Sequence, residues 1–132
     1  MSGARLLALL LACLSPFAAM ADAVEDVISD QLRAFQARDV TAAWDHASPA
    51  IRRAFGSPER FGEMVAGGYA TIWNNDVVCF GLRMVQAGRV RQTVIVTDRA
   101  GASQVFDYDL VETGGGWKIN GVRPLARDSD AA

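Results

Sequence analysis

The 132-residue sequence has few of the residues that support cross-linking or metal binding, since it contains two cysteines and one histidine. Cys13 lies in an N-terminal segment that we expect to be removed, so Cys79 would have no partner for an intramolecular disulfide. One imidazole and one thiol form no ligand cluster, and we predict neither a metal site nor a cofactor. The fold must therefore depend on a hydrophobic core.

The sequence also lacks an excess of basic residues. Lys and Arg number 13 against 15 Asp and Glu, giving a formal net charge of −2 at pH 7. Binding to a phosphate backbone needs clustered positive charge, so we do not expect a nucleic-acid partner.

No apolar run is long enough to cross a bilayer, but the N-terminus has the layout of a secretory signal. Arg5 precedes the apolar run Leu6 to Leu14, and Ala19-Met20-Ala21 supplies small residues for cleavage. We predict a signal peptide over residues 1–21 and a periplasmic or secreted protein with no stable membrane span after processing. A lipoprotein anchored at Cys13 is the less favoured alternative.

Cleavage after Ala21 leaves 111 of the 132 residues, with 12 basic and 15 acidic side chains. This length suits one domain, which we place at residues 22–125. The polar residues 126–132 are expected to form a disordered tail.

The first half of this domain has helical periodicity. Apolar residues recur at helical spacing from Asp22 to Arg38, which predicts a first helix. A second, shorter helix is expected after the capping residue Asp39, ending at Ala47 or Ser48. Ser48-Pro49 and Ser57-Pro58 each place a capping side chain before a proline, which predicts two more short helices, the last ending at Gly67-Gly68.

After Tyr69 the sequence alternates with a period of two, which is typical of β-strands. We expect a short strand at Thr71 to Trp73, a turn at Asn74 to Asp76 and a long strand from Val77 to Val85. Glycine-containing turns then divide Val90 to Val122 into three strands of an antiparallel meander. Helices followed by such a meander predict an α+β fold, with N-terminal helices packed on a curved antiparallel sheet of about four strands that together form a cone.

Turn lengths predict the strand register. A three-residue loop ending at Gly101 pairs Val94 with Phe106, Gln92 with Tyr108 and Val90 with Leu110. A turn at Gly114-Gly115 pairs Leu110 with Ile119 and Tyr108 with Gly121. In the first hairpin, either Arg83 or Met84 lies opposite Gln92, and the apolar pattern favours Met84.

The predicted row Gln92, Tyr108 and Gly121 is the main candidate for a site. Gly121 would leave space beside Tyr108, so the phenol and the amide of Gln92 could point into a cavity between sheet and helices. The alternative, which we favour from the sequence, is that the phenol bonds to the neighbouring amide within a packed core. Asp107 and Asp109 alternate away from Tyr108 and are expected to face solvent.

Several other side chains are weighed as site residues. His46 is flanked by Asp45 and followed by Ser48, but neighbours on one helical turn point in different directions, so no catalytic triad is expected. A surface or capping histidine is preferred over a general base acting with Tyr69 or Tyr108.

Cys79 is expected to be inert packing rather than a thiolate activated by Arg83. Tryptophan is expected in the core or stacked on a ligand at the cavity mouth. The pocket candidates are Gln92, Tyr108, Trp44, Tyr69, Trp117 and His46.

A set of segments spread over the predicted domain forms a recognisable pattern, and these segments are Gln31 to Phe35, Asp39, Ala43-Trp44, Ala47 to Ile51, Phe55, Phe61, Met64-Val65, Tyr69, Gln92 to Val94 and Gly116 to Ile119. Together they resemble a family of uncharacterised exported bacterial proteins. That family is similar to the nuclear transport factor 2-like superfamily, which implies a cone-shaped fold that hosts isomerases, dehydratases, hydrolases, cyclases and binding-only members. No segment matches the motifs of those enzymes, so the resemblance implies no catalytic residue.

We predict a non-catalytic domain that binds a small apolar molecule or a protein partner. The alternative is a small acid–base enzyme, isomerase-like or dehydratase-like, that uses His46 or Tyr108. A homodimer through the open sheet face is a further expectation, with Arg91, Thr93 and Ile95 in the interface.

Overall fold

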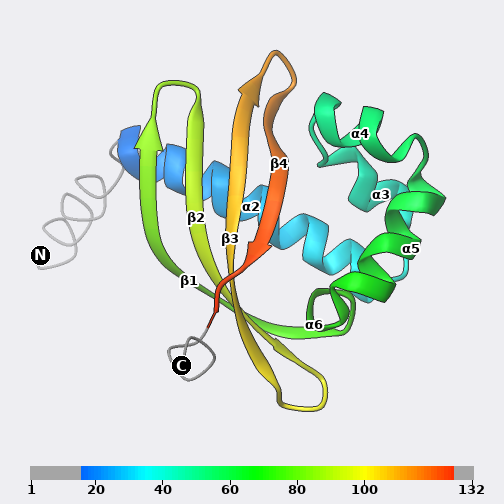
Figure 1. Cartoon of the computed structure of the whole chain (residues 1–132). Helices are drawn as coiled ribbons and strands as arrows, with labels where there is room; N and C mark the ends of the chain where they lie inside the picture. Colours follow the sequence, from blue (N-terminus) through cyan, green and yellow to red (C-terminus); the bar gives the residue numbers. More distant parts are fainter. Residues whose placement is uncertain (1–15, 127–132) are drawn as a thin grey trace, which may run out of the picture.

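The computed structural model describes residues 16–126, with side chains from residue 23 onward, and it confirms the predicted α+β architecture. Helices come first and a four-stranded antiparallel sheet follows, with the strands in the order β1-β2-β3-β4 and without closure into a barrel (Figure 1). The elements are α2 (Pro16–Gln36), α3 (Val40–Asp45), α4 (Pro49–Phe55), α5 (Pro58–Gly68), α6 (Ala70–Trp73), β1 (Asn75–Gln86), β2 (Arg89–Asp98), β3 (Ser103–Thr113) and β4 (Gly116–Pro124).

Most of the predicted signal peptide and of the predicted tail lies in residues that the structure does not describe. Residues 1–15, which include Cys13, and residues 127–132 lie outside the described part of the chain. Cleavage after Ala21, a lipid anchor at Cys13 and a disordered tail therefore stay predictions. Among the described helices, none is both long and apolar enough to cross a membrane.

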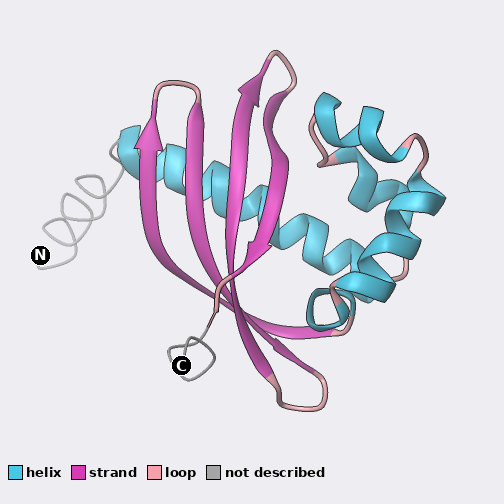
Figure 2. Ribbon diagram, viewed as in Figure 1, coloured by secondary structure: helices cyan, strands magenta, loops and turns pink. Residues whose placement is uncertain are grey.

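The helices lie on one side of the sheet. Helix α2 runs across one face of the sheet, and the shorter helices gather beside β4 (Figure 2). Val24, Ile28, Leu32 and Phe35 on α2 are buried in a core shared with the inward side chains of β2 and β3. This is the packing expected of an amphipathic helix over an antiparallel sheet.

The predicted capping residues begin the helices as expected. The carboxylate of Asp39 accepts a 3.0 Å hydrogen bond from the Ala42 amide, and the hydroxyl of Ser48 accepts one of 3.2 Å from the Ile51 amide. Ser57 caps α5 in the same way, and Pro49 and Pro58 occupy first-turn positions. Side chains that bind free amides at a helix start fix where each short helix begins.

The predicted strand at Thr71 to Trp73 is wrong, because this segment forms α6. The Trp73 amide donates to the Tyr69 carbonyl oxygen at 2.9 Å, and Ile72 is buried against the core. Asn75 is not in a turn but begins β1. Its buried side chain donates to the carbonyl oxygens of Leu32 and Ile72, so tertiary contacts override the local turn signal.

The register of β2 and β3 is confirmed, with Val94 opposite Phe106 and Gln92 opposite Tyr108. Between β3 and β4, Leu110 lies opposite Ile119 as predicted.

Beyond that pair, a bulge shifts β4 by one residue, so Tyr108 lies opposite Val122 and Asp109 lies opposite Gly121. A Cβ atom at Gly121 would lie 3.9 Å from Asp109 Oδ2. The predicted pairing of Gly121 with Tyr108 is therefore wrong, although both residues line the cavity described below.

The favoured register of β1 is also wrong. A two-residue turn at Ala87-Gly88 places Arg83, not Met84, opposite Gln92. A second bulge lies between Phe80 and Arg83 and interrupts the alternation. As a result Leu82 and Met84 face solvent, with 84% and 61% of their surface exposed.

Candidate functional site

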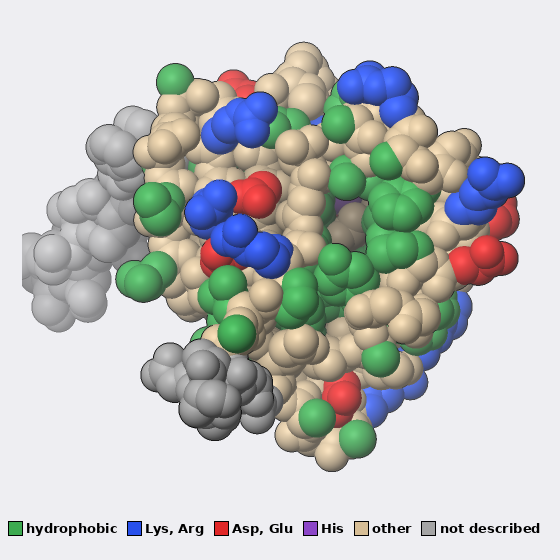
Figure 3. Space-filling model, in the orientation of Figure 1, with side chains coloured by type: hydrophobic (Ala, Val, Ile, Leu, Met, Phe, Trp, Pro, Cys, Tyr) green, Lys and Arg blue, Asp and Glu red, His purple; other side chains and the backbone are tan. Residues whose placement is uncertain are grey.

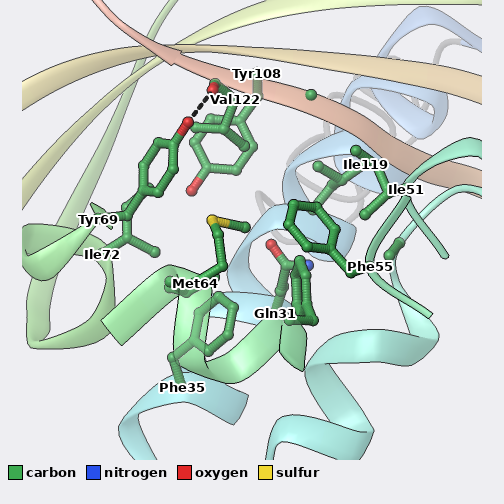
Figure 4. A pocket seen from close by; sticks show the side chains of 14 residues that line it. Gln31, Phe35, Ile51, Phe55, Met64, Tyr69, Ile72, Tyr108, Ile119 and Val122 are labelled. Carbon is green, nitrogen blue, oxygen red and sulfur yellow. Dashed lines mark hydrogen bonds between the residues drawn. The ribbon is translucent and has the colours of Figure 1, made fainter. Parts of the chain in front are cut away.

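A cavity of about 210 Å³ lies between the sheet and the helices beside β4. It is lined mainly by apolar side chains from α2, α4, α5, α6, β3 and β4, and Figure 4 shows it from close by. The space-filling view shows a hollow between β4 and the helices α4 and α5, bordered by hydrophobic side chains (Figure 3). The apolar lining residues are Phe35, Ala47, Ile51, Phe55, Phe61, Met64, Val65, Ile72, Ile119 and Val122.

Backbone hydrogen bonds hold α4 against β4 and so shape one wall of the cavity. The Ser48 amide donates to the Ile119 carbonyl oxygen at 2.8 Å, and the Ile119 amide donates to the His46 carbonyl oxygen at 2.8 Å. The Ser48 hydroxyl also donates to Asn120 Oδ1 at 2.7 Å. These contacts place Ile51, on the first turns of α4, over the apolar face of β4.

Aromatic rings form the wall opposite the sheet. Phe61 on α5 lies at the centre, with its ring centroid 6.0 Å from Phe35, 5.6 Å from Trp44 and 6.0 Å from Phe55. Tilted and edge-on aromatic pairs at these distances are favourable contacts. The wall is therefore built from side chains that support one another rather than from a flexible loop.

Tyr108 on β3 provides the polar group that stands out in the cavity. Its side chain is fully buried, and its hydroxyl has no hydrogen-bond partner among the described residues. The hydroxyl points toward the interior of the cavity (Figure 4). Burial raises the pKa of the hydroxyl, and neighbouring Tyr69 raises this pKa further. Tyr108 therefore stays protonated and can donate a hydrogen bond.

The predicted bond between Tyr108 and Gln92 does not form, although the two residues lie opposite each other. The Gln92 amide nitrogen donates to the carbonyl oxygens of Gly81, Leu82 and Thr93 at 3.1, 3.3 and 3.0 Å. Its oxygen accepts a 2.6 Å hydrogen bond from Arg83 Nε. Gln92 is thus engaged by the bulge in β1 and does not line the cavity.

Gln31 on α2 lines the cavity and was not predicted. Its amide nitrogen donates to the Ala43 carbonyl oxygen at 3.1 Å, while its oxygen accepts no hydrogen bond among the described residues. Figure 4 shows this oxygen on the cavity side. The sequence contains a signal that could have identified Gln31. It lies three residues after Ile28 and four before Phe35, and this helical spacing places it on the buried face of the helix.

Tyr69, a predicted candidate, lies at the side of the cavity at the junction of α5 and α6. Its hydroxyl donates a 3.0 Å hydrogen bond to the Val122 carbonyl oxygen (Figure 4). Its ring also packs near Phe106, with 6.3 Å between centroids.

The other predicted candidates lie elsewhere. Trp44 and Trp117 are half-buried and pack against the core without lining the cavity. His46 is half-buried outside the lining, and desolvation by burial lowers its pKa, although Asp30 and Asp45 oppose this effect. Cys79 is exposed.

The acidic pair on β3 faces away from the cavity, as expected, but it is not simply solvated. Asp107 is 9% exposed and accepts hydrogen bonds from Thr93 and Arg123 at 3.0 and 3.2 Å. Asp109 pairs with Arg91 at 3.0 Å. These contacts crosslink neighbouring strands on the outer face.

The cavity has a narrow chemical repertoire. Its described lining contains no carboxylate, imidazole, thiol, ammonium or guanidinium group. Nor do the described residues as a whole contain a group of three or more His, Cys, Asp or Glu side chains that could hold a metal ion. What the site offers is apolar surface, one free hydroxyl donor and one amide acceptor.

Comparisons with known proteins identify the family but add no activity. Searches of curated proteins and of solved structures found no match. Residues 18–132 match the model of a family described as a domain of unknown function (DUF4864), and the chain belongs to this family.

Proposed function

We propose that this protein is an exported binding domain that holds a small, largely apolar molecule in the cavity between its helices and strands β3 and β4. The observation that carries the proposal is the hydroxyl of Tyr108, which is fully buried, is directed into an apolar cavity and has no hydrogen-bond partner within residues 16–126. Leaving such a group unpaired costs roughly 1–3 kcal/mol, a cost that a bound acceptor would remove.

The size of the cavity limits the ligand. An apolar cavity of about 150 Å³ holds a benzene molecule, whereas sites for drug-sized ligands start at about 300 Å³. At about 210 Å³, this cavity suits a single ring or a short branched chain with one or two substituents.

Binding is better supported than acid–base catalysis. His46 does not line the cavity, and the raised pKa of Tyr108 makes its phenol a hydrogen-bond donor rather than a base. The described lining supplies no other group that could take up a proton near neutral pH.

The proposal of export rests on the N-terminal sequence and agrees with the chemistry of α2. Removal of residues 1–21 would leave Asp22, Glu25 and Asp26 in the first turns of the shortened helix. Acidic side chains are favourable at a helix N-terminus because of the helix dipole.

We also propose that the domain belongs to the nuclear transport factor 2-like superfamily. The order of its elements, helices first and then a curved meander, supports this placement.

Native mass spectrometry of the mature protein tests the proposal. We expect a small bound molecule on the wild type that is lost in Met64→Trp, which fills the cavity, and kept in Leu82→Trp, which adds the same bulk at an exposed site. The same spectra report cleavage after Ala21 and any homodimer. A mature protein that carries no ligand, and whose melting temperature does not rise with millimolar single-ring compounds, would contradict the proposed binding.

A further inference from the structure

Two polar atoms face the cavity from opposite layers of the fold. The hydroxyl of Tyr108 enters from the sheet, and the amide oxygen of Gln31 enters from α2 (Figure 4). The contact between the Gln31 nitrogen and the Ala43 carbonyl oxygen, at 3.1 Å, determines which end of the amide faces the cavity. A ligand in the cavity therefore meets a donor on one wall and an acceptor on the other.

The same lining disfavours charged ligands. No described lining residue carries a charge that could pair with a carboxylate or an ammonium group. Moving an unpaired ion from water into such a site is costly, and the Gln31 oxygen would also repel an anion. An uncharged ligand has no such penalty.

We propose that the ligand is an uncharged molecule with a compact apolar body that carries both a hydrogen-bond acceptor, which receives the Tyr108 hydroxyl, and a donor, which binds the Gln31 oxygen. Carboxamides and alcohols have this chemistry. This inference rests on the proposed function, because it assigns the ligand class of the same cavity.

Four probes of nearly the same shape separate the contributions of the apolar body, the acceptor, the donor and a negative charge to the affinity. Isopropylbenzene has no polar group, acetophenone only accepts, benzamide accepts and donates, and benzoate is an anion. Dissociation constants are measured by calorimetry on the mature wild type, Tyr108→Phe and Gln31→Met. Comparing two probes within one variant cancels any general change in stability.

We expect Tyr108→Phe to weaken acetophenone and benzamide by roughly threefold to tenfold, the worth of one hydrogen bond, and to leave isopropylbenzene unchanged. Gln31→Met should weaken benzamide by a similar factor relative to acetophenone. Benzoate should not compete with benzamide for binding to the wild type. This comparison needs no variant, so it still tests the proposal if Gln31→Met does not fold.

Two failures are distinguishable. If isopropylbenzene binds but Gln31→Met weakens benzamide and acetophenone equally, or if benzoate binds most tightly, the donor–acceptor pair is overturned while the cavity remains a binding site. If no probe binds, the proposed function itself is contradicted.

Discussion

The hydroxyl of Tyr69 donates a 3.0 Å hydrogen bond to the carbonyl oxygen of Val122, the residue that lies opposite Tyr108 on the neighbouring strand. Tyr69 belongs to the helical layer and Val122 to the edge strand β4, so the bond links the two layers beside the cavity (Figure 4). The backbone bonds of Ile119 with His46 and Ser48 link the same strand to the helices at a second point.

We expect Tyr69→Phe to lower the free energy of unfolding by about 1 kcal/mol, because the Val122 carbonyl oxygen loses a donor in a partly buried place. The ring should keep its packing near Phe106. Urea denaturation measures the change. An unchanged midpoint would show that water replaces the phenol at no cost.

Tyr108→Phe also removes a tyrosine hydroxyl, but this hydroxyl differs from that of Tyr69 in its hydrogen bonding. Here the hydroxyl is buried and has no partner in the part of the chain that the structure describes, so its removal should leave the free energy of unfolding unchanged or raise it by about 1 kcal/mol. The measurement is urea denaturation of ligand-free protein, with Tyr69→Phe as the matched control. A loss of about 1 kcal/mol or more would reveal a hydrogen-bond partner for Tyr108 in solution.

Alkaline pH should destabilise the wild type through Tyr108. Burial raises the pKa of Tyr108 in the folded protein above its ordinary value of 10.0, so above this pH the unfolded chain loses a proton that the folded chain retains. The free energy of unfolding then falls as pH rises. Tyr108→Phe should fall less steeply over the same range in denaturation curves. Parallel curves for the two proteins would contradict the raised pKa.

Features that depend on a few neighbouring residues were predictable from the sequence. Ser48 and Ser57 cap their helices, and the loop at Gly101 sets the pairing of Val94 with Phe106, because each outcome follows from local backbone chemistry. The bulges at Asn120 and at Gly81-Leu82 were not predictable in this way. They depend on contacts between distant segments, such as the bond from Ser48 to Asn120.

The site was predictable in part for the same reason. Tyr108 was named because it lies in the predicted row with Gln92, and Tyr69 was named as a possible partner of His46. Both tyrosines line the cavity. Gln92 lies in the predicted position opposite Tyr108, but the bulge in β1 directs its amide to Gly81 and Leu82. Gln31 was missed because a glutamine within a helix is usually read as solvent-exposed.

The bulge makes Gln92 a structural residue, and Gln92→Leu tests this role. The substitution leaves the carbonyl oxygens of Gly81, Leu82 and Thr93 without the amide donor and removes the acceptor that Arg83 contacts. We expect the free energy of unfolding to fall by roughly 1–3 kcal/mol. Affinity for a cavity ligand should not change, because Gln92 does not line the cavity. A variant of wild-type stability with weakened binding would reverse the assignment.

His46 should make the protein less stable in mild acid. Burial is the main cause that lowers its pKa below the ordinary value of 6.5, and Lys118 on β4 adds to this, while Asp30 on α2 and Asp45 on α3 act in the opposite direction. As pH falls through 6.5, the unfolded chain takes up a proton that the folded chain resists, so the free energy of unfolding decreases until the folded pKa is passed. His46→Gln should flatten this decline between about pH 7.5 and pH 5, above the range in which ordinary carboxylates titrate. Urea denaturation across that range measures the slope, and an equal slope in both proteins would show that the imidazole is as well solvated in the folded state as in the unfolded chain.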